Sequence, residues 1–147
     1  MKRLTREDLV NLGVTDVTED GKVYVNGKEK KISVAVRRHP YGEDKSYLVV
    51  PLCDKSRKRY IHCSKERKVR GGVREFTSWV YETVTVPLAR LMLAWFNGSI
   101  EADEDADHID NDPLNNHIDN LQPLSRRENL AKRFIDNPDA RHNQHSY

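Results

Sequence analysis

The pattern of apolar and polar positions along the chain is clearest just after Pro87, where it has the period of a helix. Apolar residues there recur at positions i, i+3, i+4, i+7 and i+8, a spacing that forms one continuous face of an α-helix. These residues are Leu88, Leu91, Met92, Trp95 and Phe96. Pro87 suits the first turn of this helix and Gly98 suits its exit. We expect the apolar face to lie in the hydrophobic core, and we assign it no chemistry.

The segment before this helix shows the shorter period of β-strands. Residues 5–8, Thr-Arg-Glu-Asp, predict the cap of a short helix that ends near Gly13. An Asp-Gly and an Asn-Gly turn pair then separate valine- and isoleucine-rich stretches, so residues 14–36 predict a small meander. Residues 47–52 and 59–63 predict a further hairpin with a basic loop beyond it. Residues 76–84 favour a strand by composition, with a helix as the alternative.

Composition narrows the class of protein. The chain has 147 residues, of which 37% are hydrophobic and 33% charged, which suits a small globular protein. It has no apolar run of the ~20 residues that a membrane span needs, and its polar N-terminus lacks the apolar core of a signal peptide. Cys53 and Cys63 are the two cysteines, and without a Cys-x-x-Cys pair they do not indicate a tetrahedral zinc site. We therefore expect a soluble cytoplasmic protein.

The net charge of +2 conceals a strong asymmetry along the chain. Residues 1–90 carry 20 Lys and Arg against 12 Asp and Glu, whereas residues 91–147 carry 5 against 11. Within residues 55–74, nine basic residues meet one acid, Glu66. A solvated face is the ordinary meaning of a charge run, but the lack of compensating acids favours a phosphate-bearing partner. The candidate nucleic-acid contacts here are Lys55, Arg57, Lys58, Arg59, Lys65, Arg67, Lys68 and Arg70.

Residues 107–129 gather the groups that carry chemistry. The segment reads Asp-His-Ile-Asp-Asn-Asp-Pro-Leu-Asn-Asn-His-Ile-Asp-Asn-Leu-Gln-Pro-Leu-Ser-Arg-Arg-Glu-Asn. Its carboxylates and carboxamides can hold a hard divalent cation, and its imidazoles can take a proton from water. Alternating polarity predicts a short strand over residues 107–109, followed by a loop over 111–120 and a return strand over 121–124. Residues 125–128, Ser-Arg-Arg-Glu, predict a capping box that opens a helix.

The spacing of these groups resembles that of the HNH nucleases, most closely the homing endonucleases of phages and introns. The motif begins with the pair Asp107-His108. Asn120 lies thirteen residues after Asp107, and Asn129 lies nine residues after Asn120. The resemblance is strong over residues 107–129 and extends back to about Val86. It implies a ββα-metal (His-Me finger) architecture and a metal-dependent DNA endonuclease that hydrolyses phosphodiester bonds. If a phage encodes the protein, the expected location is the cytoplasm of the host cell.

The resemblance also implies a role for each polar residue. His108 would be the general base, and Asp107 with Asn129 would bind the metal ion, Mg²⁺ by preference with Mn²⁺ as an alternative. Asn120 would bond backbone across the loop and hold the histidine strand in place. The partner implied is double-stranded DNA, with no membrane. Apart from the resemblance, the cations around the last helix could bind phosphates, although cations on a helix surface are ordinary; they are Arg126, Arg127, Lys132 and Arg133.

The remaining polar residues of this region receive structural interpretations. Asp103, Glu104 and Asp105 read as a solvated acidic loop, Asn115 and Asn116 as residues that brace the loop, and His117 as a solvent-facing histidine. A non-catalytic DNA-binding protein that keeps the scaffold is the main alternative, although binding alone would not need the base. A zinc-stabilised binding module is a weaker alternative.

The fold class expected is therefore α+β. Residues 1–84 would be a β-rich, basic region that contacts DNA, residues 85–135 the nuclease module, and residues 136–147 a polar tail. Relatives often continue beyond the nuclease helix into a separate DNA-binding module, whereas this chain ends within 20 residues of it. We therefore expect site recognition to come from the N-terminal region or from a partner, or to be slight.

Overall fold

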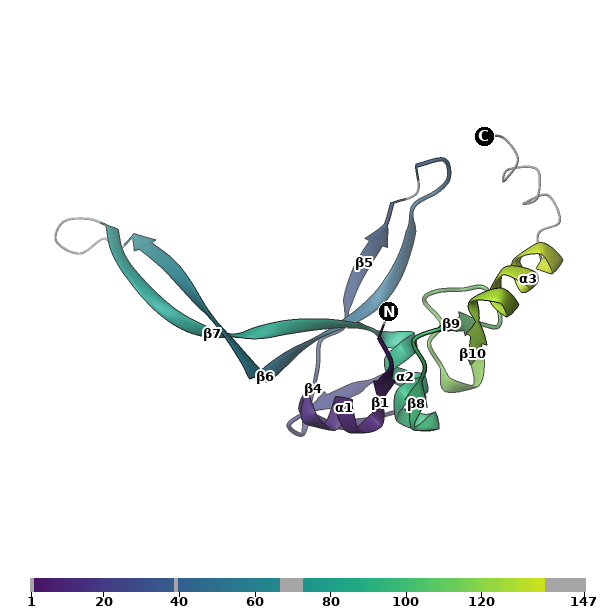
Figure 1. The fold of residues 1–147 in the computed structure, drawn as a ribbon, viewed down its shortest axis with the longest axis horizontal. Coiled ribbons are helices and arrows are strands. Elements are labelled where there is room, and N and C mark those ends of the chain that lie inside the picture. Colours follow the sequence, from purple (N-terminus) through teal and green to yellow (C-terminus); the bar gives the residue numbers. More distant parts are fainter. Residues whose placement is uncertain (1, 39, 67–72, 137–147) are drawn as a thin grey trace.

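The computed structural model describes residues 2–38, 40–66 and 73–136, and it describes side chains outside residues 62–76 and 136 (Figure 1). The elements are β1 (Leu4–Thr5), α1 (Arg6–Asn11), β2 (Val14–Val17), β3 (Val23–Val25), β4 (Lys28–Glu29), β5 (Ser33–Arg37), β6 (Lys45–Glu66), β7 (Val73–Pro87), α2 (Leu88–Asn97), β8 (Ser99–Ile100), β9 (Glu104–His108), the 3₁₀ turn η1 (Ile118–Asn120), β10 (Leu121–Ser125) and α3 (Arg126–Asp136). The strands form small antiparallel sheets, β1–β8, β2–β3–β4, β5–β6–β7 and β9–β10. The α+β class expected from the sequence is confirmed.

Helix α2 lies at the centre of the core. Every residue from Leu88 to Trp95 is buried, so the helix is covered on all sides rather than along the single face that its spacing predicts. Phe96, which the spacing placed on the buried face, is instead 38% exposed. The core around the helix is built from residues of the N-terminal elements, the base of the β6–β7 hairpin and the C-terminal hairpin. These include Leu9, Val14, Val23, Val50, Leu52, Ile100 and Leu121.

The N-terminal expectations are largely confirmed. Helix α1 has the predicted capping box, in which Thr5 Oγ1 accepts from the Asp8 backbone amide and Asp8 Oδ2 accepts from the Thr5 amide. The meander is present as β2, β3 and β4, but β5 leaves it and pairs with β6. The first strand, β1, pairs with β8, which follows the central helix. The N-terminal region and the C-terminal part of the chain therefore share one core.

The hairpin predicted between residues 47–52 and 59–63 is wrong. Both segments belong to one long strand, β6, which pairs with β7 from Val49–Pro87 at its base to Glu66–Val73 near its tip. The polar residues 54–58, which suggested a turn, form a bulge where the register shifts. Because a bulge absorbs extra residues without ending the strand, the local turn signal was misleading. The strand predicted over residues 76–84 is confirmed within β7.

The C-terminal elements follow the predicted order of strand, loop, strand and helix. The first strand begins earlier than expected, since β9 starts at Glu104 and includes residues that read as an acidic loop. The buried Arg90 explains this start, because its guanidinium donates to the Glu104 carbonyl at 2.6 Å, to the Glu101 carbonyl at 3.2 Å and to the Lys2 carbonyl at 3.1 Å. The predicted capping box of α3 is present between Ser125 and Glu128.

Candidate functional site

The site is built on the β9–β10 hairpin and the helix that follows it. Asp107 stands opposite Gln122 in the hairpin, and His108 stands opposite Leu121. Successive residues of a strand point to opposite faces, so Asp105 and Asp107 share one face of β9. Helix α3 packs along this face and supplies Asn129 and Lys132, three residues apart on the same side of the helix.

His108 is held by a residue that the sequence left as loop bracing. The buried Asn116 places Oδ1 at 2.9 Å from His108 Nε2, and its Nδ2 donates to the Pro113 carbonyl at 3.3 Å. The Pro113 contact assigns the orientation of the Asn116 amide, so the oxygen faces the imidazole and Nε2–H is the donor. In the neutral tautomer that results, Nδ1 carries the lone pair. The arrangement suits a general base.

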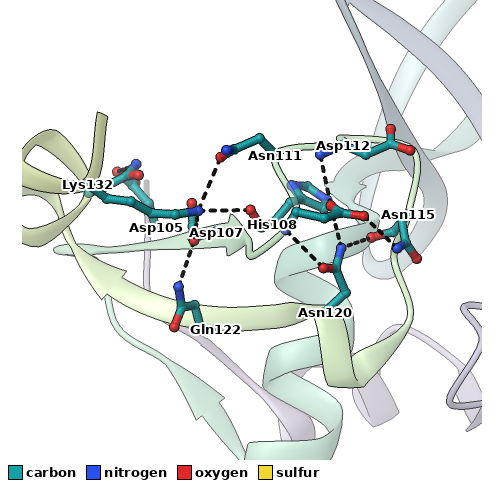
Figure 2. A network of polar contacts seen from close by, with 11 residues as sticks. Asp105, Asp107, His108, Asn111, Asp112, Asn115, Asn120, Gln122 and Lys132 are labelled. Atoms are coloured by element: carbon teal, nitrogen blue, oxygen red, sulfur yellow. Dashed lines mark hydrogen bonds and ion pairs between the residues drawn. The ribbon is translucent and has the colours of Figure 1, made fainter. Parts of the chain in front are cut away.

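The loop between the two strands is fastened by a compact polar network (Figure 2). Asn120 Nδ2 donates to Asp110 Oδ1 at 2.9 Å and to the Asn115 carbonyl at 2.8 Å, while its Oδ1 accepts from the Asp110 amide at 3.1 Å. Asn115 Nδ2 donates to Asp110 Oδ2 at 2.8 Å. Hydrogen bonds from Asn115, from the Asp112 amide and from Asn120 lower the pKa of Asp110 to about 2. These are cross-loop contacts of the kind expected for Asn120.

Asp107 already faces a cation, the ammonium of Lys132. Lys132 Nζ lies 2.8 Å from Asp107 Oδ2, 3.0 Å from the His108 carbonyl and 3.2 Å from Asn111 Oδ1 (Figure 2). Gln122 Nε2 also donates to Asp107 Oδ2, at 2.8 Å. Asn111 has a φ of 62°, in the left-handed region that asparagine tolerates, which turns the chain back after β9. Lys132 thus ties the end of the histidine strand to α3.

The side chain of Asn129 contacts Asp105, a carboxylate that the sequence indicated as part of a solvated loop. Asn129 Nδ2 lies 3.4 Å from Asp105 Oδ2. Asp105 precedes Asp107 by two residues on β9 and points to the same face. Asp105, His108 and Asn129 line one open pocket, together with Arg90, Asn116 and residues from the base of β6. The structure therefore brings His108 and Asn129 together around a common space. The two predicted metal ligands, Asp107 and Asn129, share the helix-facing surface of the site. Among the described residues, Asp107 is bonded to Lys132 and Asn129 contacts Asp105, and their role as ligands stays a prediction.

The donor chemistry of this face fits a hard cation. Asp105, Asp107 and Asn129 offer carboxylate and carboxamide oxygens, which Mg²⁺ and Mn²⁺ prefer, and Mg²⁺ commonly keeps several waters and takes few protein ligands. Within the described residues there is no cluster of three or more His, Cys, Asp or Glu, so no all-protein cage of that kind exists there. Asn129, with one or both aspartates, is the set that would hold such an ion.

The predicted DNA contacts fall into two groups. Lys55, Arg57, Lys58 and Arg59 are exposed on β6, and Arg126, Arg127 and Arg133 lie on α3. Arg57 is partly neutralised, at 3.8 Å from Asp54 and 4.0 Å from Glu82. The side chain of Lys65, and Arg67, Lys68 and Arg70 altogether, lie outside the described residues.

Comparison with protein-family models gives a match to the HNH endonuclease family over residues 87–131. This part of the chain belongs to the HNH endonuclease family. The match begins at the last residue of β7 and ends within α3, so it includes α2 and the whole β9–β10 hairpin. Neither a search of curated proteins nor a search of solved structures finds a match to the chain.

The HNH domain identifies the protein as a nuclease, and membership of the family implies activity on DNA. HNH nucleases generally use a divalent metal ion, in agreement with the oxygen donors around His108. In the part of the chain that the structure describes, no helix has the length and apolar character needed to span a membrane.

Sequence reasoning missed several residues of the HNH site. Asn116 and Lys132 make direct contacts to His108 and Asp107, and Asp105 lines the pocket. For Lys132 a signal was available, because it lies one helical turn after Asn129 and so had to share its face. For Asn116 there was none, since its role depends on how the loop folds back over β9.

Proposed function

We propose that the protein is a metal-dependent endonuclease of the homing type that hydrolyses phosphodiester bonds in double-stranded DNA, leaving 5′-phosphate and 3′-hydroxyl ends. The observation that carries the proposal is His108. Its Nε2 is engaged by the buried Asn116, and its Nδ1 lone pair is left for chemistry in a pocket shared with Asn129 and Asp105. A DNA-binding protein without catalysis would have no use for an imidazole oriented in this way.

In the proposed reaction, His108 Nδ1 takes a proton from a water molecule. The water oxygen then forms a bond to phosphorus while the bond from phosphorus to the 3′ oxygen breaks, and the departing 3′ oxygen takes up a proton from solvent to give the 3′-hydroxyl. Asn116 keeps the proton on Nε2 and so stabilises the imidazolium that forms, because its oxygen can accept from Nε2 in both protonation states. Asn120 acts indirectly, by fixing the loop that follows the histidine strand.

Mg²⁺ or Mn²⁺ would be held by Asn129 and Asp107, with Asp105 as an additional oxygen donor beside Asn129. When bound, the ion would neutralise the scissile phosphate and stabilise charge on the departing 3′ oxygen. The basic residues of β6 and of α3 would bind the flanking phosphates, so DNA would run between the hairpin arm and the last helix. Arg67, Lys68 and Arg70 would extend the same phosphate-binding surface.

The test is cleavage of supercoiled plasmid, in Mg²⁺ and in EDTA, by wild type and by His108→Ala. Loss of a general base costs on the order of 10²–10⁴ in rate, so the variant should cut at least a hundredfold more slowly. Its affinity for DNA should be nearly unchanged, because the imidazole acts on water rather than on phosphate. The ratio of nicked to linear product would show whether one strand or both are cut.

The matched control is His117→Ala. This histidine lies in the loop between β9 and β10, its Nδ1 accepts from the Asp119 amide at 3.2 Å, and it is not among the residues that line the pocket. It should cut like wild type. Cleavage by His108→Ala within threefold of wild type would rule out His108 as the base. Cleavage that persists in EDTA would rule out the metal requirement.

A further inference from the structure

The outer half of the β6–β7 hairpin is a long arm with one unusual face. Figure 1 shows the two strands leaving the rest of the molecule as a twisted two-stranded ribbon. Strand β5 pairs with β6 only over Lys45–Val49, and β7 pairs with it from Val49 onward, so beyond Val49 the two strands have no third strand beside them among the described residues. An isolated two-stranded ribbon is marginally stable in water. A ribbon that exposes apolar side chains on one face therefore indicates a partner surface.

Three aromatic residues and a lysine form that face. Tyr60 stands opposite Trp79, and Lys58 stands opposite Tyr81, so these four side chains point to the same side of the ribbon. The Tyr60 and Trp79 rings meet edge to face with centroids 5.1 Å apart, and Lys58 Nζ lies 5.3 Å from the centre of the Tyr81 ring. Although the rings contact one another, Trp79 is 65% exposed, Tyr60 57% and Tyr81 44%.

The charges near this face indicate which class of molecule it binds. Lys58 belongs to the face, Lys55 and Arg57 precede it on β6, and Arg59 points to the opposite side of the ribbon; all four are exposed. The described acids nearby, Asp54 and Glu82, both lie within 4.0 Å of Arg57. A protein partner would have to match an aromatic surface that is bordered by cations along β6, whereas duplex DNA offers phosphates around a groove lined by base edges and thymine methyl groups.

The arm is also continuous with the nuclease site. Strand β7 runs without interruption to Pro87, where the HNH match begins, and the base of β6 lines the same pocket as His108 through Lys45, Tyr47 and Leu48. Trp79 precedes Pro87 by eight residues, which spans roughly 26 Å of extended strand, or about 8 base pairs of duplex. A duplex held at His108 can therefore reach the aromatic face.

We propose that this face, formed by Lys58, Tyr60, Trp79 and Tyr81, lies in the major groove of the DNA substrate and contacts base edges roughly 8–10 base pairs from the cleaved bond. The major groove is about 12 Å wide and accepts a two-stranded ribbon, whose strands lie about 4.8 Å apart. The tyrosine hydroxyls, the indole N–H and the Lys58 ammonium provide donors for base acceptors, and the rings provide contact for thymine methyl groups. The inference rests on the proposed function, because it names how the same substrate is recognised.

The experiment uses tryptophan fluorescence. The chain has two tryptophans, and Trp95 is buried in the core at 8% exposure, so the difference between wild type and Trp79→Phe reports Trp79. A 40-base-pair mixed-sequence duplex is titrated in EDTA, while its own labelled anisotropy reports complex formation. We expect Trp79 emission to be quenched and shifted to the blue as the complex saturates. Methyl green, which occupies the major groove, should reverse the change, and the minor-groove ligand netropsin should not.

Variants separate this face from general charge. Tyr60→Ala and Trp79→Ala should each raise the Kd by about tenfold or more, with a salt slope close to that of wild type, because the cations that bind phosphates are still in place. Tyr41→Ala is the control, since Tyr41 is 83% exposed but lies outside the arm, and it should bind like wild type. Circular dichroism of each variant checks that the fold is retained.

Three results would overturn the inference. These are unchanged Trp79 emission in a saturated complex, reversal by netropsin instead of methyl green, and a change of oligomeric state in Trp79→Ala without DNA, which would make the face a self-association surface. Plasmid cleavage is measured in parallel. If the plasmid is cleaved but Trp79 emission does not change, this inference alone is wrong. If Trp79 emission changes but the plasmid is not cleaved, the proposed hydrolysis is wrong and the DNA contact is still supported.

Discussion

Replacing Lys132 by Met tests whether the nuclease site carries its own counter-ion. The Lys132 ammonium lies 2.8 Å from Asp107 Oδ2, and the side chains are 21% and 10% exposed, respectively. A cation that binds Asp107 through the same oxygen must first displace this ammonium. We therefore expect the substitution to destabilise the metal-free protein and, at the same time, to strengthen its binding of a divalent ion.

The size of the effect follows from the burial of the pair. Breaking a fully buried ion pair costs about 3–5 kcal/mol, and breaking an exposed one costs about 0–1 kcal/mol. This pair lies between these limits, and Asp107 keeps the Gln122 amide at 2.8 Å after the change. We expect a decrease of roughly 1–3 kcal/mol in the free energy of unfolding in EDTA. Part of this stability should be recovered in Mn²⁺, because a bound ion stabilises the folded state.

The assay is urea unfolding in EDTA and in Mn²⁺, combined with calorimetric titration of Mn²⁺ into the folded protein. Arg133→Met is the matched control, because it removes one positive charge from the same helix, one residue further along. Its stability should stay within about 0.5 kcal/mol of wild type. The reasoning is refuted if Lys132→Met is as stable as Arg133→Met in EDTA, or if its affinity for Mn²⁺ equals that of wild type.

Contacts elsewhere in the fold and the site give four more expected outcomes. Asn129→Asp should need less Mn²⁺ for half-maximal cleavage than Asn129→Ala, because it keeps an oxygen donor beside the carboxylate of β9. Arg90→Met should reduce stability by about 3 kcal/mol in chemical unfolding, since three backbone carbonyls would then lack a charged donor. Neutralising Lys55 and Arg59 together should flatten the salt dependence of DNA binding in anisotropy titrations, by roughly 0.9 in log–log slope for each phosphate that is no longer neutralised. The pKa of Asp110 is about 2 in the folded protein, below its ordinary ~3.9. The ionised carboxylate therefore contributes its full stabilisation above about pH 4, and this stabilisation is lost as the pH falls towards about 2. The free energy of unfolding of Asp110→Asn should consequently depend less on pH over this range than that of wild type.

The parts of the fold that the sequence predicted are those encoded by local contacts. The capping boxes at Thr5 and Ser125 and the helix after Pro87 depend on residues within one or two turns, and all are present. The long β6 strand was not predictable in the same way. Its residues 54–58 have the composition of a turn, and pairing with β7, about twenty-five residues later, decides that they form a bulge instead.

The candidate site divides along the same line. Spacing within the motif brought His108 and Asn120 to attention, because it reflects one continuous hairpin. Spacing could not show that Asn116 folds back onto the imidazole or that Asp105 rather than Asp107 lies against Asn129. Both facts depend on how the loop and α3 settle against β9, which no local pattern encodes. The roles of Asp107 and Asn129 as metal ligands stay predictions.

The central position of α2 limits how far the nuclease module can be moved between proteins. The residues that cover this helix include Leu9, Val14, Val23 and Val50, all outside the segment that matches the family. A fragment cut to residues 85–135 would expose a helix that is buried on every side in the whole chain, and would aggregate rather than fold. Grafting this nuclease onto another DNA-binding protein therefore requires carrying the N-terminal helix, the meander and the base of the β6–β7 hairpin along with it.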